Sequence, residues 1–136
     1  MKALIIEDES IAAQALEMLI KETSPETEII AVLQTIEESV EWFEENPMPD
    51  LVFMDIHLAD GSSFAIFEKT EITCPIIFTT AYDEYALKAF EVNSIDYLLK
   101  PINKADLERA LNKYKNFTAA SEKTSLDGLL AQMNIS

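Results

Sequence analysis

Short runs of aliphatic and aromatic residues recur along this chain at intervals of 20 to 26 residues. They begin near residues 3, 29, 51, 76 and 96. An interval of this length holds one strand and one helix. Short apolar runs that alternate with helices are typical of a parallel sheet that is covered on both faces. The spacing therefore predicts an α/β domain built from five strand–helix units.

The segments between these runs carry helical periodicity. Four apolar faces are predicted: Ile11, Ala15, Met18 and Leu19, with Ser10 as N-cap; Ile36, Val40 and Phe43, before the stop signal at 46–49; Tyr85, Leu87, Ala89 and Phe90; and Leu107, Ala110, Leu111 and Tyr114. Because crossover connections are right-handed, few topologies remain. The flavodoxin-like, doubly wound strand order 2-1-3-4-5 fits five such units, and its switch point lies between strands 1 and 3.

Polar residues follow four of these runs at the point where each ends. Glu7 and Asp8 follow the first run, Asp55 the third, Thr79 and Thr80 the fourth, and Lys100 the fifth. Since parallel strands bring their carboxyl ends to one edge of a sheet, we expect these side chains to converge there. Three acids, a hydroxyl and an ammonium at one edge predict a site for phosphoryl transfer with a divalent metal.

Each of these residue types has a chemical role in such a site. Asp55 can attack phosphorus as a carboxylate nucleophile and form an aspartyl phosphate. Glu7 and Asp8 offer the hard oxygen ligands that Mg²⁺ prefers, and a cation would relieve the repulsion among the three acids. Lys100 can neutralise charge on the transferring group, and Thr80 can bind a phosphoryl oxygen. Pro101 predicts a constrained turn after Lys100, where a cis bond is affordable.

The composition excludes several other kinds of protein. A formal charge of −15 over 136 residues argues against binding to a nucleic-acid backbone. Cys74 is the only cysteine, so no internal disulfide can form, and His57 is the only histidine, a poor basis for a zinc site. No apolar stretch approaches the length of a membrane span, and no signal peptide precedes the first run. We expect a cytoplasmic protein.

Two other functions remain to be compared with this one. An aspartyl phosphatase on a similar sheet would carry a second acid two residues after its nucleophile, where this chain has His57. A flavodoxin-type carrier would need a phosphate loop after the first strand, where Glu7, Asp8 and Glu9 would repel phosphate. Both alternatives are therefore weaker.

The set Glu7-Asp8, Asp55, Thr80-Ala81 and Lys100-Pro101 resembles the receiver domain of bacterial two-component response regulators, over about residues 2–117. The stretch from Phe78 to Ile102 is most similar to receivers that precede a LytTR-type DNA-binding domain. The resemblance implies a CheY-like fold and a signalling domain that is not an enzyme, apart from its own phosphorylation and slow autodephosphorylation.

The resemblance also implies a role for each matching residue. Asp55 would be the phospho-acceptor. Mg²⁺ or Mn²⁺ would bind Glu7, Asp8, Asp55 and the backbone carbonyl of His57, although many relatives have Asp where Glu7 stands. The phosphoryl contacts and switch would involve four residues: Thr80, Ala81, Lys100 and Tyr97. Tyr97 would be the aromatic partner of Thr80, whereas the sequence alone favours a plain packing role for it.

The expected partners follow from the same resemblance. They are a sensor histidine kinase, an output domain that binds DNA, and a second copy that pairs on phosphorylation through the face of the fourth helix, fifth strand and fifth helix. That face carries a mixed-charge set: Lys88, Glu91, Lys104, Asp106, Glu108, Arg109 and Lys113. The alternative is a degenerate or stand-alone receiver that acts only by binding other proteins. The kinase, the stimulus and the target genes are not readable from the sequence.

The last part of the chain differs in character from the rest. We expect a receiver domain over residues 1–117, and a linker with the start of a helix over 118–136. Leu126, Leu129, Leu130 and Met133 form one apolar face there. This face predicts that the chain continues into an output domain beyond Ser136.

Overall fold

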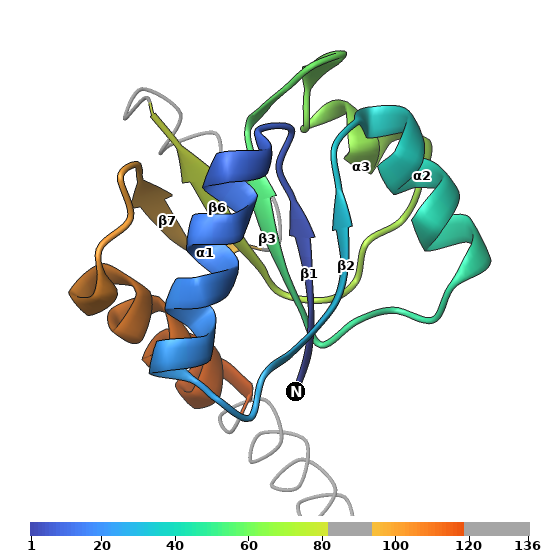
Figure 1. Cartoon of the computed structure of the whole chain (residues 1–136). Helices are drawn as coiled ribbons and strands as arrows, with labels where there is room; N and C mark the ends of the chain where they lie inside the picture. Colours follow the sequence, from blue (N-terminus) through green and yellow to red (C-terminus); the bar gives the residue numbers. More distant parts are fainter. Residues whose placement is uncertain (82–93, 119–136) are drawn as a thin grey trace, which may run out of the picture.

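A computed structural model describes residues 1–81 and 94–118 of the chain. A five-stranded sheet, all of whose neighbouring strands pair in parallel, lies at its centre (Figure 1). Its order, β2-β1-β3-β6-β7, is the predicted order 2-1-3-4-5 once the strands of a small separate hairpin are left out of the count. The predicted topology is thus confirmed. The strands are β1 (Lys2–Ile6), β2 (Glu28–Leu33), β3 (Leu51–Asp55), β6 (Ile76–Thr80) and β7 (Ser94–Leu99).

Helices cover both faces of this sheet. α1 (Ser10–Thr23) and a helix over residues 104–118 lie on one face, while α2 (Ile36–Glu45) and α3 (Ala65–Lys69) lie on the other (Figure 1). The central strands β3 and β6 are buried at every position. This burial explains why their sequences are apolar without alternation.

The two faces have separate hydrophobic cores. On the α2 and α3 side, Phe78 of β6 is fully buried, and its ring centroid lies 5.2 Å from that of Phe64 and 6.3 Å from that of Phe67. On the α1 side, Leu16 and Ile20 pack with Leu107 and Leu111 of the 104–118 helix. Full burial of side chains of this size stabilises the fold by about 1.5–3 kcal/mol each.

The helices themselves are close to the prediction, with two errors, both in α1. The predicted faces of α2 and of the 104–118 helix point inward, but that of α1 does not. Ile11 is 84% exposed and Met18 64% exposed, whereas Ala13, Leu16 and Ile20 are buried. The prediction of Ser10 as N-cap is also wrong: α1 begins at Ser10 itself, Glu9 is the N-cap residue, and no side chain caps that end.

One feature of the fold was not predicted, and several predictions lie outside the described residues. β4 (His57–Leu58) and β5 (Gly61–Ser62) form a small antiparallel hairpin directly after β3. The helical face at 85–90, the charged residues Lys88 and Glu91, and the apolar face at 126–133 lie outside the described residues. Among the residues that the structure describes, no helix has both the length and the apolar character needed to cross a bilayer.

Candidate metal and phosphoryl site

The acidic residues of the predicted site lie at the ends of neighbouring central strands. Glu7 and Asp8 follow β1, and the Glu7 backbone N–H donates to the Leu33 carbonyl at 2.8 Å, so the end of β1 is tied to the end of β2. Asp55 ends β3, opposite Thr79 of β6. Carboxylate oxygens of Glu7, Asp8 and Asp55 lie within 4.8 Å of one another.

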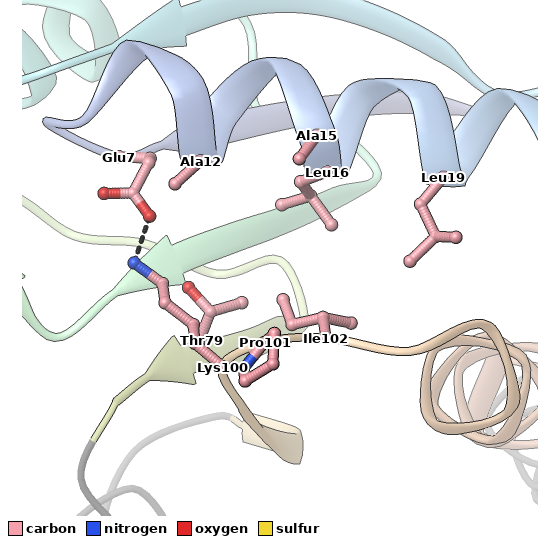
Figure 2. Close-up of a pocket in the computed structure, with 9 residues that line it drawn as sticks. All are labelled: Glu7, Ala12, Ala15, Leu16, Leu19, Thr79, Lys100, Pro101 and Ile102. Atoms are coloured by element: carbon pink, nitrogen blue, oxygen red, sulfur yellow. Dashed lines mark hydrogen bonds and ion pairs between the residues drawn. The ribbon is translucent and has the colours of Figure 1, made fainter.

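Lys100, in the loop after β7, adds a positive charge to this group of acids. Its backbone N–H donates to the Thr80 carbonyl at 2.7 Å, which fixes the chain just after β7. Its Nζ donates to Asp55 Oδ2 at 2.9 Å and also to Glu7 Oε1. Figure 2 shows the side chain reaching from the loop towards Glu7. The Lys100–Pro101 peptide bond is cis.

Burial makes the charges of this group strongly interdependent. The side chains of Glu7 and Asp55 are 4% and 8% exposed, and that of Lys100 is 22% exposed. Burial raises the pKa of Glu7 to about 7; the bond from Lys100 opposes this rise and the neighbouring Asp55 adds to it. Burial alone would lower the pKa of Lys100, but its bonds to Glu7 and Asp55 raise it above the usual range.

The donor set fits a hard divalent cation. When all three carboxylates are ionised they carry three negative charges, and Lys100 supplies one positive charge, which leaves a net −2 at the edge of the sheet. Mg²⁺ carries the charge that would balance this excess. It takes one or two carboxylates with water and phosphate oxygens as its remaining ligands. Glu7, Asp8 and Asp55 therefore fit the ion that the sequence predicts.

The other predicted residues surround this group. Thr80 is fully buried at the end of β6, and Ala81 follows it at the surface. Tyr97 is half-buried on β7, paired in register with Phe78, and packs against the core on the α2 and α3 side. The side chain of His57 is exposed, and its backbone N–H donates to Asp55 Oδ1 at 3.3 Å.

A cavity of about 390 Å³ opens beside the site, between α1 and the loop after β7 (Figure 2). Glu7, Thr79 and Lys100 form its polar part. Its apolar walls come from both sides: Ala12, Ala15, Leu16 and Leu19 of α1, and Pro101 and Ile102 of the loop. Of the three acids, Glu7 is the one that lines this cavity.

Sequence reasoning missed two polar residues with several bonds each. The Asp60-Gly61 pair indicates only a turn from its residue types, but the Asp60 carboxylate also accepts hydrogen bonds from the first two residues of α2. Asp96 on β7 is buried and pairs with Arg109 at 3.2 Å and Lys113 at 3.4 Å. The spacing of Asp96, Arg109 and Lys113 gave a weak signal, because residues four apart on a helix lie on one face.

Comparison with known proteins gives a consistent result. A family model described as the response regulator receiver domain matches residues 3–112. The sensory transduction protein LytT of Bacillus anthracis is 41% identical, over 85% of this chain and 47% of that protein. The transcriptional regulatory protein LytR of Staphylococcus aureus is 35% identical, over 98% of this chain and 54% of that protein. The chain thus spans about half the length of these relatives.

Solved structures agree with this assignment. The response regulatory domain of mrkE from Klebsiella pneumoniae matches with a TM-score of 0.72 and 32% identity, over 90% of this chain and 99% of that one. The response regulator PhyR from Brucella abortus matches with a TM-score of 0.77 and 28% identity, over 91% of this chain and 51% of that one. The chain belongs to the receiver domains of two-component response regulators, and it is similar to those of the LytT and LytR regulators.

Proposed function

We propose that this receiver accepts a phosphoryl group on Asp55 from a phosphohistidine of a sensor kinase in the cytoplasm. One observation carries the proposal: Lys100 binds both Asp55 and Glu7, beside Asp8, at the one sheet edge where strand ends converge. A nucleophile, a cation ligand set and a counter-charge thus lie within one small volume. Phosphoryl transfer depends on such positioning and charge stabilisation.

The transfer itself needs little covalent chemistry from the protein. A carboxylate oxygen of Asp55 attacks phosphorus in line with the leaving imidazole. An O–P bond forms while the N–P bond breaks with its electron pair on nitrogen, and the released imidazole takes up a proton from water. Lys100 Nζ already contacts Asp55 Oδ2, so it can follow the incoming phosphoryl oxygens and hold their charge.

Glu7, Asp8, Asp55 and the His57 carbonyl would hold the divalent cation. When bound, Mg²⁺ neutralises charge that develops on the phosphoryl oxygens. The chain keeps these ligands in place by its backbone: Glu7 through Leu33, and Ile56, the residue after Asp55, through Thr79 at 3.1 Å.

The output follows from the charge that phosphorylation adds. Thr80 moves towards the new phosphate, Tyr97 occupies the space released, and the face built on β7 and the 104–118 helix changes its population of states. We assign residues 1–117 to the receiver and 118–136 to a link with an output domain. Because the LytR relative is a transcriptional regulator, we propose that this output domain binds DNA.

Intact mass spectrometry after incubation with acetyl phosphate and Mg²⁺ tests the proposed function. Wild-type protein should gain one phosphoryl group that is lost in mild base, and EDTA should prevent the gain. Asp55→Asn, which keeps the shape of the side chain but not its nucleophilic charge, should gain none. An unmodified wild type would identify a degenerate receiver, and an equal gain in Asp55→Asn would place the acceptor elsewhere.

Phosphorylation is also expected to strengthen self-association through β7 and the 104–118 helix. β7 is an edge strand, Leu99 on it is 44% exposed, and Lys104 and Glu108 of the helix are exposed. Arg109 and Lys113 are engaged within the chain by Asp96, so they are not free for a partner in this state. Sedimentation velocity with beryllofluoride should show a larger dimer fraction than without it. Asp55→Asn is the control, and an unchanged wild-type monomer fraction would contradict the expectation.

A further inference from the structure

Asp60 binds a helix far from it in sequence. Its carboxylate accepts from the Ile36 backbone N–H at 2.9 Å and 3.1 Å, through Oδ1 and Oδ2, and from the Glu37 N–H at 3.3 Å. These are the first two residues of α2. The helix already has its own N-cap, because Thr35 Oγ1 accepts from the Glu38 N–H at 3.0 Å. Asp60 therefore links its own segment to the start of α2 by hydrogen bonds that are additional to the cap from Thr35.

The hairpin that carries Asp60 begins two residues after Asp55. His57 pairs with Ser62 and Leu58 with Gly61, so Asp60 lies at the tip. At the base of the hairpin the His57 N–H donates to Asp55 Oδ1 at 3.3 Å, and the Ser63 N–H donates to the Ile56 carbonyl at 2.8 Å. A movement at the tip would therefore be transmitted to the backbone beside Asp55.

The hairpin and α2 also touch through apolar atoms. Gly61 has φ +136°, a conformation that side chains other than hydrogen rarely adopt, and a Cβ added there would lie 3.4 Å from Ile36 Cδ1. Leu58 is 7% exposed in the core that also contains Ile36. The carboxylate thus lies where the backbone of the hairpin already packs against the Ile36 side chain.

The start of α2, to which Asp60 binds, is connected to the site through β2. Leu33 ends β2 two residues before Thr35, and its carbonyl accepts from the Glu7 N–H at 2.8 Å. One continuous set of contacts then runs from Glu7 to Leu33, along the chain to Ile36, across to Asp60, and back through His57 to Asp55. Asp60 closes this ring of contacts.

The charges also favour the hydrogen bonds between Asp60 and the N-terminus of α2. The N-terminus of a helix attracts anions, and two backbone N–H groups of α2 point at the carboxylate. The pKa of Asp60 is lowered, first of all by the hydrogen bond from Ile36. The tie is therefore made by the ionised side chain at neutral pH.

We propose that Asp60 is a positioning residue for the cation site: by holding the 57–62 hairpin on the N-terminus of α2, it sets the affinity of Glu7, Asp8 and Asp55 for Mg²⁺ without touching the ion. This inference rests on the proposed function. Since linkage is reciprocal, cation binding must also tighten the bonds of Asp60 to Ile36 and Glu37.

The test compares two variants that each remove one side chain from the same helix end. Asp60→Ala removes the tie to the hairpin, whereas Thr35→Ala removes only the helix's own cap. Calorimetric titration of the full chain with Mg²⁺ should give an affinity about 10-fold weaker for Asp60→Ala, the loss typical of residues that support a ligand. Thr35→Ala should bind like wild type. Asp60→Asn keeps one acceptor oxygen and should recover most of the affinity.

Amide hydrogen exchange supplies a readout that is independent of phosphorylation. In metal-free protein, Asp60→Ala should speed exchange at His57 and Ser63, and Thr35→Ala should not. In wild type, Mg²⁺ should slow exchange at Ile36 and Glu37. Equal affinity in Asp60→Ala and Thr35→Ala would overturn the inference alone. A wild type that binds no Mg²⁺ would overturn the proposed function as well, so the two failures are distinct.

Discussion

Lys100→Met should slow the phosphorylation of Asp55 by acetyl phosphate about 100-fold, the loss expected when one positioned charge donor is removed from a transition state. Met keeps an unbranched side chain but has no charge and no donor. In the structure Lys100 Nζ contacts both Asp55 and Glu7, and no other Lys or Arg among the described residues pairs with these acids. The rate is measured by mass spectrometry as the phosphorylated fraction against time at saturating Mg²⁺.

The same substitution should also destabilise the metal-free protein. Removing one partner of a buried ion pair costs about 3–5 kcal/mol, and because Lys100 is partly reached by water we expect about 2 kcal/mol. Asp55→Asn should have the opposite sign, since it removes one of three mutually repelling acids. Urea unfolding in EDTA measures both effects, and added Mg²⁺ should restore part of the stability of Lys100→Met.

Lys100→Arg separates charge from shape in this experiment. It keeps the positive charge, so the stability loss should be small, but its planar guanidinium cannot occupy the place of the ammonium between two carboxylates. Phosphorylation should therefore be slower than in wild type and faster than in Lys100→Met. If Lys100→Met were phosphorylated at the wild-type rate, Lys100 would have no part in the transfer.

The topology could be predicted because it depends on features that repeat locally. Apolar runs of strand length, separated by helical segments, permit few arrangements, and right-handed crossovers reduce them further. The convergence of Glu7, Asp55 and Lys100 then follows from the strand order alone. None of this requires knowledge of individual side-chain contacts.

The face of α1 could not be predicted, because the helix is apolar on more than one side. Ile11, Ala15 and Met18 have the spacing of a core face, and so have Ala13, Leu16 and Ile20. The sheet and the 104–118 helix select the second set, in which Leu16 and Ile20 meet Leu107 and Leu111. Periodicity alone cannot choose between two apolar stripes when the deciding contacts are long-range.

The hydrogen bonds of Asp60 and the ion pairs of Asp96 could not be predicted for a related reason. An Asp-Gly pair indicates a turn from local conformation, and this is correct for Asp60 and Gly61. The partner of the Asp60 carboxylate, however, lies 24 residues earlier in the chain. Asp96 is likewise a strand residue whose partners lie on a later helix. Hydrogen bonds across such distances follow from the fold, and the four-residue spacing of Arg109 and Lys113 is only a weak local signal of them.

Phe78→Ala should lower the free energy of unfolding by about 3–5 kcal/mol, because the lost ring leaves a cavity that its neighbours fill only in part. Phe78 is fully buried at the centre of β6, with the rings of Phe64 and Phe67 against it. Phe117→Ala is the matched control, since it makes the same chemical change at a side chain 45% exposed, and it should cost less than about 1 kcal/mol. Urea unfolding followed by circular dichroism measures both.

The cation site should survive this loss in the molecules that remain folded. Glu7 and Asp8 follow β1 and Asp55 ends β3. The ion pairs of these acids involve Lys100, and the backbone bonds of Glu7 and Ile56 that hold them in place involve Leu33 and Thr79, not Phe78. Mg²⁺ affinity per folded molecule should then match wild type, while Mg²⁺ raises the folded fraction by mass action. A Phe78→Ala protein as stable as Phe117→Ala would show that the α2 and α3 core does not depend on this ring. A folded variant with weakened Mg²⁺ binding would show that packing on that face reaches the acids through β6.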